Sequence, residues 1–323
     1  MPCRPRRFFP LLAAALVGAP LAHAATPNAD NSQSQAVFSG HLEVGIAREF
    51  THASEIKLGN GPVLLLPGES MRKADNYRRV EAGTNISVPC GAQLACVANA
   101  DVESRTGAST SEFDTGIATG DAGMQYTAGT VVYGLRAGRQ QWDVGGQSFR
   151  RVNTLVGDAV TAIGEQLSAY GSAEMSRYEH SGVNAFLDAD YRALTGNLRW
   201  GTNNKWQSAY TVQATASREV NRQQNPYLDV RGLLVRLGWD AKPAERWMIA
   251  PAFMVQTLHY GGVDPAFGLQ RNERFTQVEL VANYKINEKL TWRFELMRAR
   301  YRSSAEVINN DWASVGTVLR WEF

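Results

Sequence analysis

DWASVGTVLRWEF, residues 311–323, is the stretch of sequence that decides the fold. From Ala313 to Phe323 every second residue is apolar except Thr317, and the residues between them are Ser314, Gly316, Val318, Arg320 and Glu322. Successive side chains of a β-strand point to opposite faces. The pattern therefore predicts a strand with one apolar face and one largely hydrophilic face.

The same alternation recurs upstream, near residues 206–215, 232–239, 277–286 and 290–297. With their flanks these segments run for about 11 to 14 residues, whereas strands of soluble proteins usually have about 5 or 6. A tilted strand that crosses a bilayer needs about 9 to 11 residues. Strand length therefore favours a membrane-spanning sheet over a soluble sandwich.

Tryptophans support this interpretation. Six of the eight flank short connections or the C-terminus, namely Trp200, Trp206, Trp239, Trp247, Trp292 and Trp321. An amphipathic indole is most stable at a membrane–water interface, so we expect these six to form a ring at one interface. Trp142 and Trp312 border long connections, and we expect them at the opposite interface.

The whole pattern predicts fourteen strands, at 36–50, 74–88, 93–105, 113–126, 130–142, 151–163, 166–178, 185–200, 206–218, 229–240, 247–259, 274–286, 290–302 and 311–323. Their connections alternate between short and long, with 143–150 and 260–273 among the long ones, as in outer-membrane barrels. Closure is required because lipid cannot hydrogen-bond a sheet edge. The prediction is an all-β, transmembrane, antiparallel up-and-down β-barrel of about 14 strands, in the outer membrane of a Gram-negative bacterium.

Parts of this strand assignment leave alternatives open. Segments 93–105, 113–126 and 151–163 are polar or glycine-rich, so twelve or sixteen strands remain possible. Pro251 lacks a ladder donor, and we expect a bulge beside it.

The N-terminus has the features of an export signal. A basic start with Arg4, Arg6 and Arg7 precedes an apolar run from Phe8 to Leu21 and the sequence AHA, so residues 1–24 are a predicted signal peptide. Residues 25–35 are then a short periplasmic tail, and 36–323 form the barrel. Beyond the signal no apolar run reaches the length of a membrane helix. Removing the three arginines lowers Lys+Arg from 33 to 30, against 31 Asp+Glu, so nucleic acid is not an expected partner.

The mature chain keeps Cys90 and Cys96, separated by GAQLA. In an exported protein this spacing favours a hairpin disulfide, because no further zinc-type ligands accompany the pair. We expect no metal and no cofactor.

Charges on the hydrophilic faces are predicted to line the lumen. The candidates are Glu43, Arg136, Glu174, Asp188, Asp190, Arg192, Arg236, Glu279, Lys285, Arg293, Glu295, Arg320 and Glu322. A wall of mixed charge is typical of paired, hydrated groups. Asp188 and Asp190 could instead bind a cation, although Arg192 is expected to neutralise them.

The aromatic C-terminus, with Leu319, Trp321 and Phe323 at two-residue intervals, resembles that of substrates of the barrel-insertion machinery. The last 120 residues or so also resemble the barrel domain of the surface lipoprotein assembly modifier family. This resemblance rests on YGGVDPAFGLQRNERF at 260–275 and the INEKLTW turn at 286–292, and the motif residues are Tyr260, Asp264, Pro265, Phe267, Gly268 and Arg271. It implies a fourteen-stranded barrel whose external loop contacts a surface-exposed or secreted client. Members usually carry a periplasmic helical-repeat domain, which this sequence does not show before its first strand.

Two functions from different classes follow. One is a protein-handling barrel that assists translocation or display of a client, and the other is a passive porin-like channel for small solutes. Adjacent His180 and Ser181 invite comparison with outer-membrane hydrolases, but we expect no enzyme, because neighbours in a strand point to opposite faces. The expected partners are outer-membrane lipid, the insertion machinery and a client protein.

Overall fold

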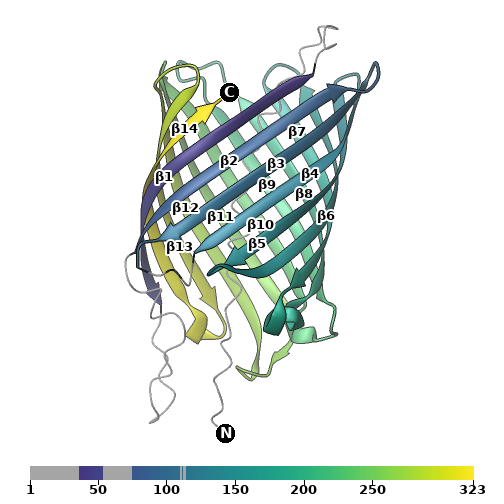
Figure 1. Ribbon diagram of the computed structural model, residues 1–323, viewed down its shortest axis with the longest axis vertical. Helices are drawn as coiled ribbons and strands as arrows, with labels where there is room; N and C mark the ends of the chain where they lie inside the picture. Colours follow the sequence, from purple (N-terminus) through teal and green to yellow (C-terminus); the bar gives the residue numbers. More distant parts are fainter. Residues whose placement is uncertain (1–35, 54–74, 110, 112–113) are drawn as a thin grey trace.

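A computed structural model describes residues 36–53, 75–109, 111 and 114–323. The predicted signal peptide and the tail at 25–35 lie outside the described residues. The chain forms a closed antiparallel barrel in which each strand pairs with its sequence neighbours and β1 pairs with β14 (Figure 1). The strands are β1 Val37–Ala53, β2 Asp75–Pro89, β3 Leu94–Gly107, β4 Thr115–Ala128, β5 Val131–Val144, β6 Gln147–Ile163, β7 Leu167–His180, β8 Ala189–Gly201, β9 Ala209–Asn221, β10 Val230–Ala244, β11 Trp247–Asp264, β12 Leu269–Lys285, β13 Leu290–Ser303 and β14 Asn310–Glu322.

The predicted barrel of fourteen strands is confirmed, and two of its predicted long connections are wrong. The segment 143–150 is a tight turn, because Gly145 and Gly146 adopt φ of 57° and 73° and let β5 continue directly into β6. The segment 260–273 is mostly strand, with only residues 265–268 between β11 and β12. Polar and glycine-rich composition concealed both strand extensions.

The C-terminal extension of β11 packs against the short 3₁₀ helix η5 (Pro226–Leu228). A side chain at Gly261 would lie 2.9 Å from the carbonyl oxygen of Pro226, so glycine permits this close approach. The register between β11 and β12 shifts here, between His259 and Val263. At Pro251 the expected bulge is wrong, because the register with β10 shifts only between Ala241 and Ala244.

The seam of the barrel is closed by the last residue. Phe323 N donates to Gly40 O at 3.0 Å, and Gly40 N donates to Phe323 O at 2.9 Å. The Phe323 ring covers Gly40, where an added Cβ would lie 2.6 Å from the ring carbons, and it packs 6.1 Å from the ring of Phe38. We call the end of the barrel where β1 begins and β14 ends the C-terminal end, and the opposite end the loop end (Figure 1).

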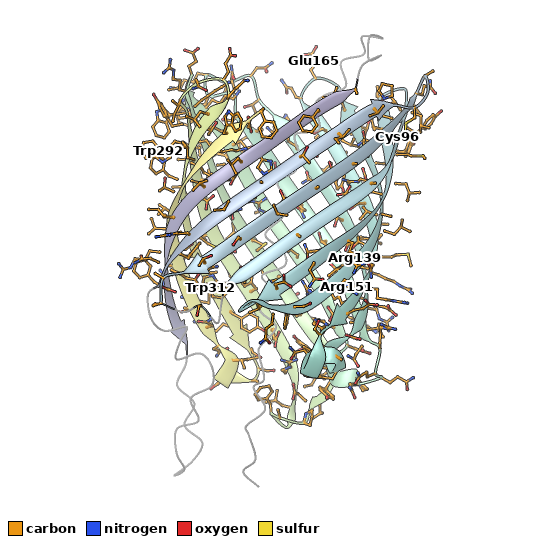
Figure 2. The ribbon with its side chains drawn as sticks, in the orientation of Figure 1. Cys96, Arg139, Arg151, Glu165, Trp292 and Trp312 are labelled. Carbon is orange, nitrogen blue, oxygen red and sulfur yellow. A yellow bond between two sulfur atoms is a disulfide. The ribbon has the colours of Figure 1, made fainter. Side chains whose placement is uncertain are left out.

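The outward face is apolar over much of its height. Exposed outward side chains include Val44, Ile46, Leu135, Leu194, Leu233 and Leu296. The predicted tryptophan ring is confirmed in position: Trp200, Trp206, Trp247, Trp292 and Trp321 are exposed near the C-terminal end, where Trp206 also packs 6.2 Å from Trp239 (Figure 2). This face has the character of one that contacts lipid.

Trp142 and Trp312 do not join an opposite ring, so that expectation is wrong. Trp312 shares the face of Val318 and Arg320, and its ring packs 5.5 Å from that of Phe275 inside the barrel. A small inward core of Leu234, Met254, Phe275 and Ala299 lies beneath it. Trp142 also points inward, with Arg150 stacked over its ring at 4.7 Å. In the part of the chain that the structure describes, the loop end also holds the 3₁₀ helices η4 (Gly182–Leu187), η5 and η6 (Glu306–Ile308).

In the part of the chain that the structure describes, no helix combines the length and the apolar composition needed to cross a membrane.

Candidate functional site

The lumen wall is charged at the seam, where the first strand, β1, pairs with the last strand, β14. Glu43 on β1 has a side chain only 1% exposed, and it binds two arginines: Arg320 Nη1 lies 2.6 Å from Oε1, and Arg293 Nη1 lies 3.2 Å from Oε2. Arg320 also bonds Glu322 at 2.8 Å, and Arg293 lies 3.6 Å from Glu295. Alternation along β13 and β14 turns all four partners inward, as the sequence predicted. The result is a network that ties β13, β14 and β1 together.

This network has a neighbour on β2 and β3. Arg79 bonds Glu81, and its Nε lies 3.3 Å from Glu103. His41 Nε2 lies 3.2 Å from Glu81 and 3.7 Å from Asp101. Glu43 stands directly opposite Glu81, and Glu81 directly opposite Glu103. Three carboxylates therefore form one row across the wall, held by arginines on either side.

His41, Glu81 and Asp101 offer ligand atoms within 4.8 Å of one another, which is the geometry of a possible cation site. Arg79 already neutralises Glu81 in this group. We therefore assign no metal to it.

Other predicted lumen charges also point inward. Arg236 on β10 bonds Glu279 on β12, and Arg136 on β5 lies 3.2 Å from Asp158 on β6. Glu174 accepts a hydrogen bond from Ser176 Oγ at 2.6 Å. These contacts confirm that much of the predicted set is paired.

The predicted group on β8 is wrong. Asp190 and Arg192 share the outward face with Leu194, and both are exposed. Asp190 pairs with Arg177 on the outside of the barrel, at 3.4 Å. Asp188 precedes the strand, where its Oδ1 accepts from His180 N at 2.7 Å and caps the loop. The three residues therefore do not form a shared cation site.

Lumen-facing acids exceed lumen-facing bases among the described strand residues. The acids are Glu43, Glu49, Asp75, Glu81, Asp101, Glu103, Asp121, Asp158, Glu174, Glu219, Asp240, Asp264, Glu273, Glu279, Glu295 and Glu322, and the bases are Arg79, Arg105, Arg136, Arg150, Arg199, Arg236, Arg271, Lys285, Arg293 and Arg320. Asp121 and Glu174 are bonded to neutral donors, Asn99 and Ser176. Among the described residues, neither carboxylate has a cationic side chain within 4 Å.

An aromatic and basic cluster lines the wall near the loop end. Arg150, only 4% exposed, lies over the ring of Trp142 at 4.7 Å and over that of Tyr178 at 5.0 Å. His180 packs edge-on against Phe149, with ring centroids 5.5 Å apart, and its Nδ1 is 3.6 Å from Asp188. These cation–π and aromatic contacts stabilise the lumen wall at this end of the barrel.

His180 and Ser181 are not brought together as base and nucleophile. Ser181 Oγ bonds Ser148 Oγ at 3.1 Å, whereas the His180 side chain is turned inward and is 1% exposed. Each side chain therefore has a structural neighbour of its own.

The motif residues near 260–271 hold the β11–β12 hairpin together. Tyr260 donates to Glu273 at 2.9 Å, and Arg271 stacks 3.9 Å from the Tyr260 ring while its Nε lies 3.1 Å from Asp264. Asp264 Oδ1 also accepts from Ala266 N at 2.9 Å. Three of the six candidate client-contact residues are thus inward ties.

The tip of this hairpin is different. Pro265 and Gly268 are exposed, and Phe267 is half-buried. Gly268 has φ of 69°, a conformation that favours glycine at the turn. The tip is therefore the part of the motif that a partner could reach.

Two further predictions are confirmed. Cys90 and Cys96 form a disulfide in the turn between β2 and β3. Leu319 and Trp321 face outward at the C-terminal end, each more than two-fifths exposed, and Phe323 completes the seam.

The charges on β2 and β3 are absent from the predicted set of lumen residues. Arg79 and Glu81 sit two apart in NYRRVEAG, as do Asp101 and Glu103 in ADVES, and that spacing places each pair on one face of a strand. A set of outward arginines at the loop end is also absent from the predictions. Both sets of residues could be assigned to their faces from the two-residue alternation of the sequence.

Comparison of the sequence with protein-family models gave no match, and comparison with curated proteins gave none. Solved structures are similar in fold. The anion-selective porin from Comamonas acidovorans superposes with a TM-score of 0.52 at 9% identity, over 90% of this chain and 99% of that one. A loop L8 deletion mutant of OmpT, an outer-membrane protein of Vibrio cholerae, gives 0.50 at 9% identity, with 90% and 99% covered. The chain therefore shares the closed-barrel fold of these outer-membrane proteins.

Proposed function

We propose that the protein is an outer-membrane pore through which small solutes diffuse, with a preference for cations. The observation that carries this proposal is the exposure of charged side chains on opposite walls of the lumen. Asp101 on β3 is 42% exposed, and Arg236, seven strands away on β10, is 41% exposed. A barrel filled by side chains would bury both groups. Their exposure supports a hydrated passage.

The preference for cations follows from the excess of lumen carboxylates. Most of the lumen arginines are already paired with acids, while Asp121 and Glu174 are not. A lumen with net negative charge raises the local concentration of cations. The fold is shared with an anion-selective porin, but ion preference depends on the lining, which at 9% identity does not transfer.

Planar-bilayer recordings test this proposal. In a tenfold gradient of KCl, the refolded protein should give stable conductance steps and a reversal potential of the sign for K⁺ over Cl⁻. The variant D121N/E174Q should move that potential toward zero while it keeps the conductance steps. The matched control is D190N, which removes an outward acid and should leave the potential unchanged. Absence of conductance by folded protein would overturn the pore, and unchanged selectivity in D121N/E174Q would overturn its cause.

A second candidate is assistance to a surface-exposed or secreted protein, as the family resemblance implies. The observation in its favour is the long β11–β12 hairpin, whose exposed tip holds Pro265 and Gly268. Replacing residues 265–268 by Asn-Gly shortens the tip and spares the Tyr260–Glu273 tie. Client display on intact cells should then fall if the tip contacts a client. Unchanged display, with barrel folding checked in parallel, would reject this function.

A further inference from the structure

Among the described strand residues, outward-facing arginines lie only in the half of the barrel nearer the loop end. They lie on β1, β2, β5 to β10, β12 and β13, and all are exposed: Arg48, Arg78, Arg139, Arg151, Arg177, Arg192, Arg218, Arg231, Arg274, Arg298, Arg300 and Arg302. We call this set the arginine belt. Each member lies in the half of its strand nearer the loop end, as Figure 2 shows for Arg139 and Arg151. The outward acids in the same zone are fewer, namely Asp143, Glu179, Asp190 and Asp311.

The belt begins where the apolar band stops. Along β10 the outward residues are Trp239, Leu237, Val235 and Leu233, and the next is Arg231. Eight positions separate Trp239 from Arg231, which is about 27 Å of strand and about 20 Å of height at the usual tilt. An apolar band of about 25 Å crosses the hydrocarbon layer. Arg231 therefore lies near the loop-side edge of the apolar band, from where its long side chain extends to the lipid headgroups.

Several belt members face each other rather than an acid. Arg192 stands directly opposite Arg218, and Arg218 directly opposite Arg231. Arg274 likewise stands opposite Arg302, although Arg302 is itself paired with Asp311 at 2.6 Å. Over the ranges the structure describes, Arg192, Arg218, Arg231 and Arg274 have no carboxylate within 4 Å. Like charges directly opposite across a sheet are destabilising, so the row needs an external anion to become favourable.

The chemistry of the row fits phosphate. A guanidinium presents a planar fork that binds phosphate oxygens in pairs, and neighbouring forks can share one group. Between Arg231 and Arg274 the row continues through His259 and Asn272, whose side chains bond each other at 2.8 Å. Polar side chains therefore follow one row of paired positions from β8 to β12, and Arg274 and Arg302 adjoin its end.

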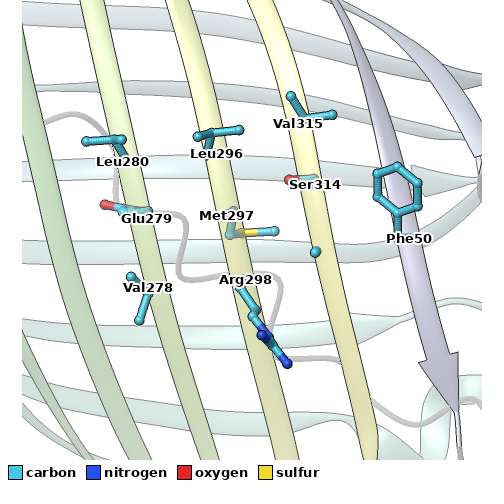
Figure 3. A pocket seen from close by; sticks show the side chains of 10 residues that line it. Phe50, Val278, Glu279, Leu280, Leu296, Met297, Arg298, Ser314 and Val315 are labelled. Carbon is cyan, nitrogen blue, oxygen red and sulfur yellow. The ribbon is translucent and has the colours of Figure 1, made fainter.

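An apolar hollow adjoins the belt on the same outward face. It is lined by Val278, Leu280, Leu296, Val315 and Phe50, and Arg298 lies at its loop-side edge (Figure 3). The small side chain of Ala313, opposite Arg298, leaves the space. A chain of methylenes fits such a surface, while a charged group at its loop-side end would meet the arginines.

We propose that the arginine belt binds the phosphate groups of a phosphorylated lipid in the outer leaflet. The acyl chains of this lipid lie against the adjoining apolar band of the barrel. Charge complementarity selects this occupant, because the outward-facing strand arginines among the described residues gather at one end, at the edge of the apolar band. The proposal concerns the outward face and stands whatever passes through the lumen.

Native mass spectrometry of the full chain in zwitterionic micelles gives the test. The probes are diphosphorylated lipid A, the same lipid after enzymatic removal of both phosphates, and inorganic phosphate. Wild type should retain diphosphorylated lipid A at least tenfold better than the dephosphorylated form. Inorganic phosphate, added in excess over the phosphate groups of the lipid, should not displace diphosphorylated lipid A.

The variant R192Q/R218Q/R231Q should lower retention at least tenfold. Its matched control is K205Q/K242Q/R246Q, which removes three exposed cations from the C-terminal end and should retain lipid A like wild type. Heat-modifiable gel migration verifies that both fold. Without lipid, the belt variant should melt at or above the wild-type temperature, because removing like charges relieves repulsion, and with lipid A the order should reverse.

Equal retention of phosphorylated and dephosphorylated lipid would overturn the proposal, as would unchanged retention by the belt variant. Displacement by inorganic phosphate would show a general anion surface. Loss of an oligomer by the belt variant in lipid-free micelles would assign the belt to contacts between copies of the chain.

Discussion

Arg320 on β14 and Glu43 on β1 form an ion pair across the seam of the barrel, with Nη1 2.6 Å from Oε1 and the glutamate 1% exposed. Strand pairing at this seam joins residues that are far apart in the chain. The ion pair, together with Arg293, is therefore a side-chain tie at the place where closure must be specified.

Removing the shared acid should weaken this tie. We expect E43A to lower the free energy of unfolding by about 3 kcal/mol, because two arginines lose a buried partner while each keeps a second, more exposed acid. The control E322A removes a half-exposed carboxylate and should cost about 1 kcal/mol or less. Urea titration followed by tryptophan fluorescence in micelles measures both. Equal losses would show that Glu43 has no special role in closure.

The two faces of β9 should respond differently to charge. Ala214 lies on the outward face midway between Tyr210 and Arg218, so A214R should destabilise the barrel in vesicles by about 2 to 4 kcal/mol. Gln213, the next residue, faces the lumen, and Q213R should cost far less. Folding titrations in vesicles compare them. A larger loss for Q213R would mean that the faces are assigned the wrong way round.

Closure should also depend on Gly40. An alanine Cβ there would lie 2.6 Å from the Phe323 ring and 2.9 Å from the carbonyl oxygen of Gly83, so G40A should cost about 1 to 3 kcal/mol. At Gly157, also outward, nothing lies within 4 Å of an added Cβ. G157A should be neutral or slightly stabilising, since it restricts the unfolded chain. The fraction with folded gel migration reports both, and a normal G40A would refute the proposed role of the terminal ring.

The Cys90–Cys96 disulfide should contribute modestly to the free energy of unfolding. Its cysteines are only six positions apart, and a short closed loop constrains the unfolded chain by about 2 kcal/mol. Urea midpoints with and without reductant should differ accordingly, and C90S/C96S should match the reduced protein. A barrel that failed to fold in reductant would contradict this expectation.

Alternation predicted the strands well because each face meets one environment for most of its height. It failed for Asp190 and Arg192, where charge was equated with the lumen. Their parity with Leu194 places them outward, but beyond the hydrocarbon layer an outward residue meets headgroups and is often charged. Trp142 and Trp312 fail for the converse reason, since an inward tryptophan can pack in the wall.

The ties of the β11–β12 hairpin could not be predicted from alternation. Arg271 and Asp264 meet across the register shift between His259 and Val263, so counting along either strand from the regular ladder does not pair them. Their positions depend on the packing of β11 against η5, which is a tertiary contact. A motif that resembles a contact loop in sequence is here largely an internal brace.

The arginine belt also has a kinetic consequence for biogenesis. A barrel that enters the membrane with its loop end leading must carry every outward arginine of the belt through the hydrocarbon layer before these arginines reach the far leaflet. Each guanidinium at the midplane costs about 2 to 4 kcal/mol, so simultaneous passage of the belt would face a prohibitive barrier. Unassisted insertion into a thick bilayer should therefore be slow and should accelerate in thinner ones. Once inserted, the same barrier opposes extraction and locks the orientation of the barrel.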